Sequence, residues 1–97
     1  MKSVFIAFNQ ANTERMDYML DRLGVRGFTM WEDVKGRGTV KGDPRLGNHT
    51  WPEMNSAVMA IVEDDQVEAL LEGVKKLDKI NDEVGVKAFV WDILQMV

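Results

Sequence analysis

Cysteine is absent from this sequence of 97 residues, and histidine, proline and long apolar runs are scarce. Without cysteine the chain cannot form disulfides, use a thiol nucleophile or hold a metal in a thiolate cage. No apolar run approaches the roughly 20 residues of a membrane-spanning helix, so we expect a chain that is not embedded in a membrane. Met1 and Lys2 lead directly into a strand-like stretch without a signal-peptide pattern, which predicts a cytoplasmic protein.

Excess positive charge is also lacking. Lys and Arg total 12 against 16 Asp and Glu, which gives a formal net charge of −4. Proteins that bind nucleic acids cluster basic residues against the phosphates, so this balance predicts no nucleic-acid partner. The hydrophobic content of 45% is enough for a packed core, and the length suits one domain spanning residues 1–97.

The apolar pattern predicts four strands and two helices. Strand-like composition occurs in four stretches: 3–8, 25–34, 56–62 and 86–93. Apolar residues recur at helical spacing in two: 13–23, and a second that opens at Asp64 or Asp65 and runs to Lys79. The order β-α-β-β-α-β predicts an α+β, ferredoxin-like sandwich, with a four-stranded antiparallel sheet and two helices on one face.

Local signals mark the ends of these elements. Asn12 or Thr13 is expected to cap the first helix, and Gly24 to end it in a left-handed conformation. An Asp65–Glu68 capping box is expected at the second helix. A turn is expected at residues 81–85.

Two helices can cover only one face of the sheet, and the other face is predicted to be apolar as well. Phe5, Trp31, Phe89 and Trp91 fall on that face, and the third strand is apolar throughout. An uncovered apolar face of this size is typical of an interface, so we expect self-association through it.

Residues 36–55 are predicted to form a long loop. The segment holds the only histidine, both prolines and four of the eight glycines, and it follows neither the helix nor the strand period. At the start of the loop, residues 35–42 (KGRGTVKG) combine basic side chains with glycines that let backbone N–H groups approach an anion. The stretch does not have the ending of a Walker sequence.

A metal site is a second possibility for the same loop. His49 is either a ligand or base, or a loop histidine bonded to backbone or water. With Glu53 and Met54 it could bind a divalent or copper ion, although a closed zinc site needs four ligands and would require several copies of His49 around a symmetry axis. Four other methionines are predicted to fill the core: Met16, Met19, Met30 and Met59.

Catalytic groupings are absent from the sequence. A lone histidine without a partner serine does not make a triad, so we predict that the protein is not an enzyme. A small ferredoxin-like enzyme remains the last alternative. It would need Glu32 or Asp33 in a pocket between the sheet and the helices.

Several stretches together resemble the PII family of nitrogen regulatory signalling proteins. They are residues 24–29 (GVRGFT), 34–42 (VKGRGTVKG), 64–65 (DD) and 87–90 (KAFV). The resemblance covers almost the whole chain. It implies a homotrimer of ferredoxin-like subunits that binds ATP or ADP in the clefts between subunits. It further implies that residues 36–55 correspond to the T-loop, which docks onto a membrane transporter or an enzyme as the regulated target.

The resemblance also assigns binding residues. Gly27 and Thr29 would contact the base edge of the nucleotide, and Gly38 and Lys87 would lie near its phosphates. Val40 stands where other members carry a glutamine that helps to hold magnesium and 2-oxoglutarate.

Three further departures concern the phosphates and the loop. The turn 80–85 is acidic where the family has a glycine- and lysine-rich loop, and the sequence ends at Val97, before the arginines of the family's tail. These differences disfavour a triphosphate. The only tyrosine, Tyr18, lies outside the loop, whereas some members carry a modified tyrosine there.

The expected function is therefore a PII-like regulatory trimer that senses an adenine nucleotide or another small ligand and signals through its loop. The alternative is a metal-binding or metal-tolerance trimer, similar to the CutA type, that uses His49.

Overall fold

A computed structural model describes residues 1–80 and 85–97, with Lys79 and Ile80 described in their backbone only. The strands are β1 (Lys2–Asn9), β2 (Phe28–Val34), β3 (Asn55–Val62) and β4 (Lys87–Asp92). The helices are α1 (Thr13–Arg22) and α2 (Val67–Ile80), each preceded by a 3-10 turn, η1 (Gln10–Asn12) and η2 (Asp64–Gln66). The predicted βαββαβ order is confirmed.

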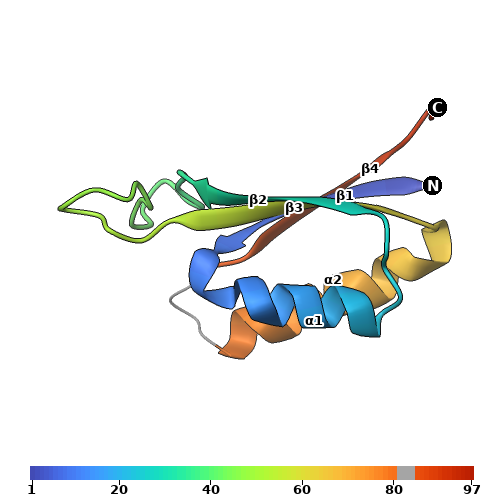
Figure 1. Ribbon diagram of the computed structural model, residues 1–97, viewed down its shortest axis with the longest axis horizontal. Helices are drawn as coiled ribbons and strands as arrows, with labels where there is room; N and C mark the ends of the chain where they lie inside the picture. Colours follow the sequence, from blue (N-terminus) through green and yellow to red (C-terminus); the bar gives the residue numbers. More distant parts are fainter. Residues whose placement is uncertain (81–84) are drawn as a thin grey trace.

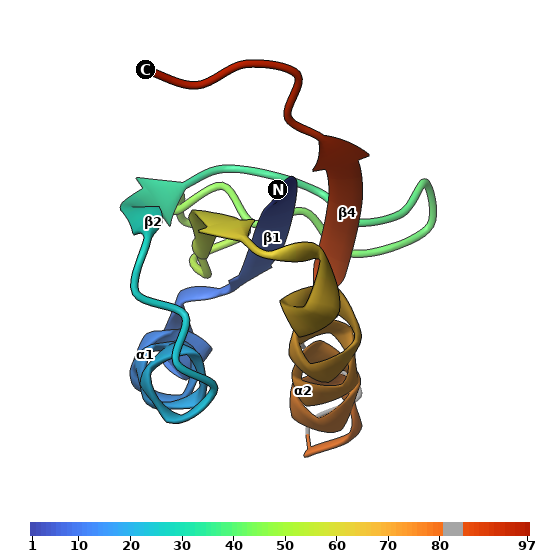
Figure 2. The same ribbon diagram turned by 90° about the vertical axis from the view of Figure 1, so that its right-hand side faces the viewer.

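The four strands form one antiparallel sheet in the order β2-β3-β1-β4. Both helices cover the same face of this sheet (Figures 1 and 2), which confirms the ferredoxin-like sandwich. The β2–β3 loop, residues 35–54, extends beyond one end of the sheet, while the chain termini lie at the other end (Figure 1). Asn55, which we had placed in the loop, is the first residue of β3.

The core lies between the sheet and the helices. Alternate residues of β1, namely Val4, Ile6 and Phe8, have no exposed surface, and they pack with Met16 and Leu20 of α1. The alternation follows from the pleat of the strand, which sends successive side chains to opposite faces.

Helix α1 ends as its glycine predicts, but the following strand begins later than expected. Gly24 has a φ of 73°, and its N–H donates to the carbonyl of Asp21. The N–H of Val25 donates to the carbonyl of Leu20, which completes a Schellman motif. Val25 therefore caps α1, and β2 starts at Phe28 instead of residue 25.

The predicted N-cap position of α1 is confirmed at Asn12, but the predicted capping box before α2 is wrong, because a 3-10 turn precedes each helix and the capping hydrogen bonds form at the start of that turn. Asn9 caps η1 by accepting a hydrogen bond from the N–H of Ala11, and Asn12 makes no side-chain cap. The capping box before α2 joins Glu63 to Gln66. The expected turn at 81–85 lies outside the described residues except for Gly85.

The sheet face away from the helices is apolar and uncovered in the single chain, as predicted. Trp31, Phe89 and Trp91 are 44%, 56% and 45% exposed on that face. Met59, which we had placed in the core, also lies there, because it pairs with Phe5. No helix among the described residues is long and apolar enough to cross a membrane.

Candidate functional site

The β2–β3 loop leaves the sheet through an irregular point in β2. The pairing of β2 with β3 shifts between Trp31 and Val34, and Asp33 between them has a φ of 58°. Aspartate is among the few residues besides glycine that adopt this left-handed conformation with some frequency. The N–H of Asp33 donates to the side-chain oxygen of Gln10 at 3.1 Å.

Gln10 holds both stems of the loop. Its side chain accepts from Asp33, which lies within the irregularity in β2, and its backbone N–H donates to the carbonyl of Met54 at 3.0 Å. Met54 is the last loop residue before β3. Turn η1 therefore fixes the direction in which the loop leaves the domain.

Within the loop, Gly36 and Arg45 form a short antiparallel bridge. Their N–H groups donate to each other's carbonyls at 2.9 and 2.7 Å. The Arg45 guanidinium also donates to the side-chain oxygen of Asn55 at 2.8 Å. These bonds narrow the loop at its root and tie it to the start of β3.

The loop starts at β2, one edge strand of the sheet, and passes beyond β4, the opposite edge strand (Figure 2). The root of the loop therefore approaches the start of β4. A Cβ at Gly38 would lie 4.0 Å from Lys87 Cε, and one at Gly85 would lie 3.8 Å from the Arg45 guanidinium. Glycine backbone, a lysine and an arginine therefore lie close together here. These groups suit an anion such as a phosphate, because glycines let N–H groups approach it and the cations balance its charge.

The structure thus brings together two of the four predicted ligand-binding residues, Gly38 and Lys87. The other two, Gly27 and Thr29, lie at the opposite edge of the sheet. Thr29 of β2 pairs with Met59, and the Gly27 carbonyl accepts from the N–H of Ile61. In the order β2-β3-β1-β4, three spacings between neighbouring strands separate β2 from β4. At about 4.8 Å for each spacing, Thr29 and Lys87 lie roughly 14 Å apart across the sheet.

The predicted metal ligands, His49, Glu53 and Met54, lie in the second half of the β2–β3 loop. His49 is exposed in a turn where the N–H of Asn48 donates to the carbonyl of Trp51. The Met54 side chain packs against Gly47, so closely that a Cβ there would clash with its sulfur. No group of three or more His, Asp or Glu side chains that could hold a metal occurs among residues 1–80 and 85–97, leaving aside the side chains of residues 79 and 80.

The enzyme alternative also gains no support. Glu32 and Asp33 are exposed, and the groove that we find lies between α1 and α2 and contains neither residue. Gln10 and Arg45 were missed by the sequence reasoning, because nothing in their local pattern reveals contacts with residues 9 to 44 positions away.

Two charge pairs lie at the other end of the molecule, outside this site. The N-terminal amino group donates to Asp64 at 3.0 Å and holds the pKa of that carboxyl below its ordinary value. Lys2 pairs with Asp92, and this hydrogen bond raises the pKa of the lysine. Both pairs lie near the chain termini, away from the loop (Figure 1).

Comparisons with solved structures identify the same fold in PII-like proteins. CPII from Thiomonas intermedia K12, a nitrogen regulatory PII-like protein bound to ADP, AMP and bicarbonate, is similar with a TM-score of 0.72 and 23% identity. The match covers 97% of this chain and 88% of CPII. The apo form of CPII gives a TM-score of 0.68 at 22% identity, covering 95% of this chain and 89% of that one.

A protein from Thermus thermophilus, described as PII-like and signalling, is similar with a TM-score of 0.65 and 21% identity. It is covered over 83% of its length by 93% of this chain. No curated protein sequence matches the chain significantly. The model of the family described as nitrogen regulatory protein P-II matches residues 1–97. The chain therefore belongs to the nitrogen regulatory protein P-II family.

Proposed function

We propose that the protein is a PII-like regulatory trimer that senses an adenine nucleotide in the clefts between its subunits. Its β2–β3 loop would then control a partner protein, a membrane transporter or an enzyme. The observation that carries this proposal is the division of the predicted ligand-binding residues between opposite edges of one sheet.

That division favours a site shared between two copies of the chain. Gly38 and Lys87 lie together at the β4 edge, while Thr29 lies at the β2 edge, roughly 14 Å away. A nucleotide bound between two subunits would contact the β2 edge of one subunit through its base and the β4 edge of the other through its phosphates. The apolar sheet face supplies the surface on which the copies would associate.

The residues near Lys87 indicate which nucleotide fits. Lys87 and Arg45 provide positive charge, and the glycine backbone at residue 38 can approach a phosphate. Val40 is 92% exposed and has no oxygen or nitrogen in its side chain that could bind magnesium. We therefore expect ADP or AMP to bind better than the magnesium complex of ATP. ADP and AMP are also the nucleotides bound to CPII.

Signalling would begin at the loop root. Gly38 belongs to the β2–β3 loop, so a phosphate bound beside it contacts the loop directly. Arg45 holds the same root through Gly36 and Asn55. A ligand that draws Arg45 toward itself changes the balance of these hydrogen bonds, and with it the position of the loop tip.

Ligand binding can be tested by thermal shift and calorimetry with ADP, AMP and ATP. A ligand at 100 times its dissociation constant stabilises the fold by about 2.7 kcal/mol. Lys87→Gln should weaken nucleotide binding at least tenfold, because it removes a charged group beside the phosphates. Lys75→Gln is the matched control, since Lys75 lies on α2 and pairs with Glu72.

The shared cleft can be tested by subunit mixing. Thr29→Tyr should block the base edge, and Lys87→Gln the phosphate edge, so neither variant alone should bind nucleotide well. When the two variants are co-expressed, one cleft in each mixed trimer combines both intact edges, and roughly a quarter of the clefts should recover binding. No recovery in mixed trimers would contradict a shared site, and a monomeric wild type would contradict the whole proposal.

A further inference from the structure

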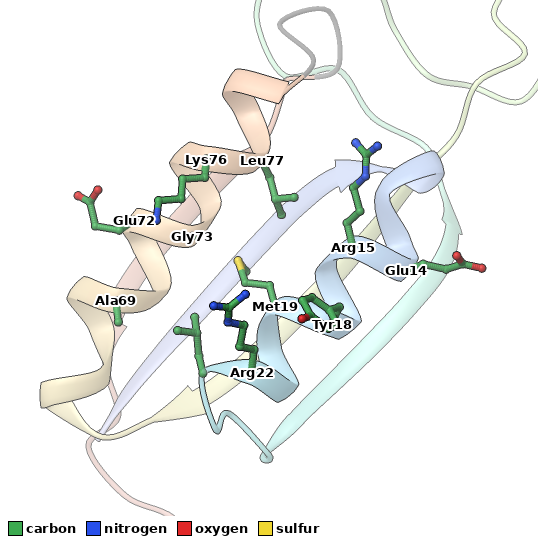
Figure 3. A pocket seen from close by; sticks show the side chains of 11 residues that line it. Glu14, Arg15, Tyr18, Met19, Arg22, Ala69, Glu72, Gly73, Lys76 and Leu77 are labelled. Atoms are coloured by element: carbon green, nitrogen blue, oxygen red, sulfur yellow. The ribbon is translucent and has the colours of Figure 1, made fainter.

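The outer surface of the helix layer contains a groove that the proposed nucleotide site does not use. It lies between α1 and α2 and has a volume of about 850 Å³, within the range of small-molecule sites. Figure 3 shows Met19 and Arg22 reaching from α1 toward α2, and Leu77 reaching from α2 toward α1. The groove lies on the face of the sheet that carries the helices, so it stays open in a trimer built on the opposite face.

The floor of the groove is apolar and its shape depends on a glycine. Met19, Leu23 and Leu77 line it together with Ala69 and Gly73. A Cβ at Gly73 would clash with the sulfur of Met19, so the absence of a side chain there lets the methionine approach α2. An apolar floor favours the burial of an aliphatic chain or an aromatic ring.

The rim of the groove is rich in cations. Arg15, Arg22 and Lys76 line the groove, and no ion pair joins any of them to an acidic group among the described residues. Of the two acidic residues on the rim, Glu72 pairs with Lys75 at 3.2 Å. The other, Glu14, points away from α2 (Figure 3). The charge left over at the rim is therefore positive, in a chain whose net charge is negative.

We propose that this interhelical groove binds a small amphiphilic anion, with its apolar part over Met19 and Leu77 and its anionic head at the cations of the rim, Arg22 of α1 and Lys76 of α2. The planar guanidinium of arginine can donate two parallel hydrogen bonds to a carboxylate or to a phosphate, so the anionic head can be either group. Tyr18, which is 67% exposed at the rim, offers a hydroxyl group to the same head.

The test uses decanoate and decyl phosphate as probes, with octyl glucoside as a neutral amphiphile, on the intact protein. Binding is followed by calorimetry and by ¹H–¹⁵N chemical-shift changes. We expect saturable shifts of amides in α1 and α2 with the anionic probes, and binding at least tenfold weaker with octyl glucoside. Comparison of the two anions shows whether the head is carboxylate or phosphate.

Three variants make the test specific. Arg22→Gln combined with Lys76→Gln should weaken binding at least tenfold, since it removes charge-assisted hydrogen bonds to the head. Ala69→Phe should block the groove without disturbing the core, because Ala69 is exposed. Arg26→Gln is the control, because Arg26 is exposed between α1 and β2 and does not line the groove, so it should leave the affinity unchanged.

The proposal is overturned if no probe gives saturable shifts in the two helices, or if the shifts occur in the strands of the open sheet face. It is equally overturned if octyl glucoside binds as well as decanoate, or if Arg26→Gln weakens binding as much as the double variant does. Far-UV circular dichroism of each variant shows that any loss of binding occurs in a folded protein.

Discussion

The substitution Phe89→Glu tests whether the uncovered sheet face is the surface on which subunits associate. Phe89 lies on β4 opposite Phe5, outside the core between the sheet and the helices, and is 56% exposed. A fully covered aromatic side chain buries roughly 150–250 Å², so the exposed part of Phe89 offers roughly 100 Å² to a partner. At about 25 cal/mol per Å² this amounts to about 2.5 kcal/mol in each subunit.

In a symmetric trimer the change occurs three times, which gives about 7.5 kcal/mol per assembly from lost apolar contact alone. Since about 1.4 kcal/mol corresponds to tenfold, the association constant should fall by roughly five orders of magnitude. The introduced carboxylates add the cost of burying unpaired charge. We expect a folded monomer at micromolar concentration.

The assay is light scattering coupled to size exclusion, with circular dichroism to verify folding. Tyr18→Glu is the matched control, because Tyr18 is an exposed aromatic residue on the helix layer and should leave the trimer intact. The reasoning is refuted if folded Phe89→Glu keeps the mass of the wild type. It is also refuted if Tyr18→Glu dissociates the assembly to the same extent.

Three further predictions concern stability and the loop root. The folded pKa of Asp64 is below its ordinary value of 3.8, so its stabilising contact is complete above that pH and lost as the pH falls through the folded pKa. Asp64→Asn should therefore lower the denaturation midpoint at pH 7, and this difference should vanish in strong acid; a constant difference would contradict the linkage. Asp33→Val should destabilise the fold by about 1–2 kcal/mol in urea titrations, because a β-branched residue is strained at a φ of 58°, whereas Asp33→Gly should not destabilise it. Gln10→Ala should cost about 1 kcal/mol and speed hydrogen exchange at the Asp33 amide. The backbone bond from residue 10 to Met54 should stay protected, and equal protection of both amides in wild type and variant would contradict the role of the side chain.

The fold was predictable because its signals are local and periodic. The run of strand-forming residues at 3–8 predicts a strand, the helical spacing of Met16 and Leu20 predicts a helix with one buried face, and the structure confirms both. The left-handed conformation of Gly24 was predictable for a similar reason, since the end of a helix at a glycine depends mainly on residues close to it in the sequence.

The predictions that were wrong concern competition between neighbouring signals. Asn9, Asn12 and Thr13 can all cap a helix, and which side chain makes the capping hydrogen bond depends on η1, whose position is set by contacts with the loop stems. Met59 shows a second limit. A strand that is apolar on both faces does not reveal which alternate residues meet the helices, and pairing with Phe5 decides it.

The candidate site was predictable only through the resemblance to a family, because its residues are far apart in the sequence. Gly38 and Lys87 approach each other across 49 positions only when the loop crosses the end of the sheet. The contribution of Arg45 could not be predicted at all, since it depends on Asn55 at the start of β3 and on Gly85 before β4.

The same contacts explain how a bound effector could reach a partner without passing through the core. Gln10 and Arg45 hold the two stems of the β2–β3 loop against the domain, and Gly38, which lies between those stems, faces Lys87. Under the proposed function, a ligand at Lys87 would therefore act on the loop at its root, where a small displacement would produce a larger movement at the tip. Because the buried residues of β1 and the helices need not move, a ligand has to supply only the difference in free energy between two arrangements of the loop. This difference is small compared with the stability of a domain, which suits a loop that responds to the concentration of a metabolite.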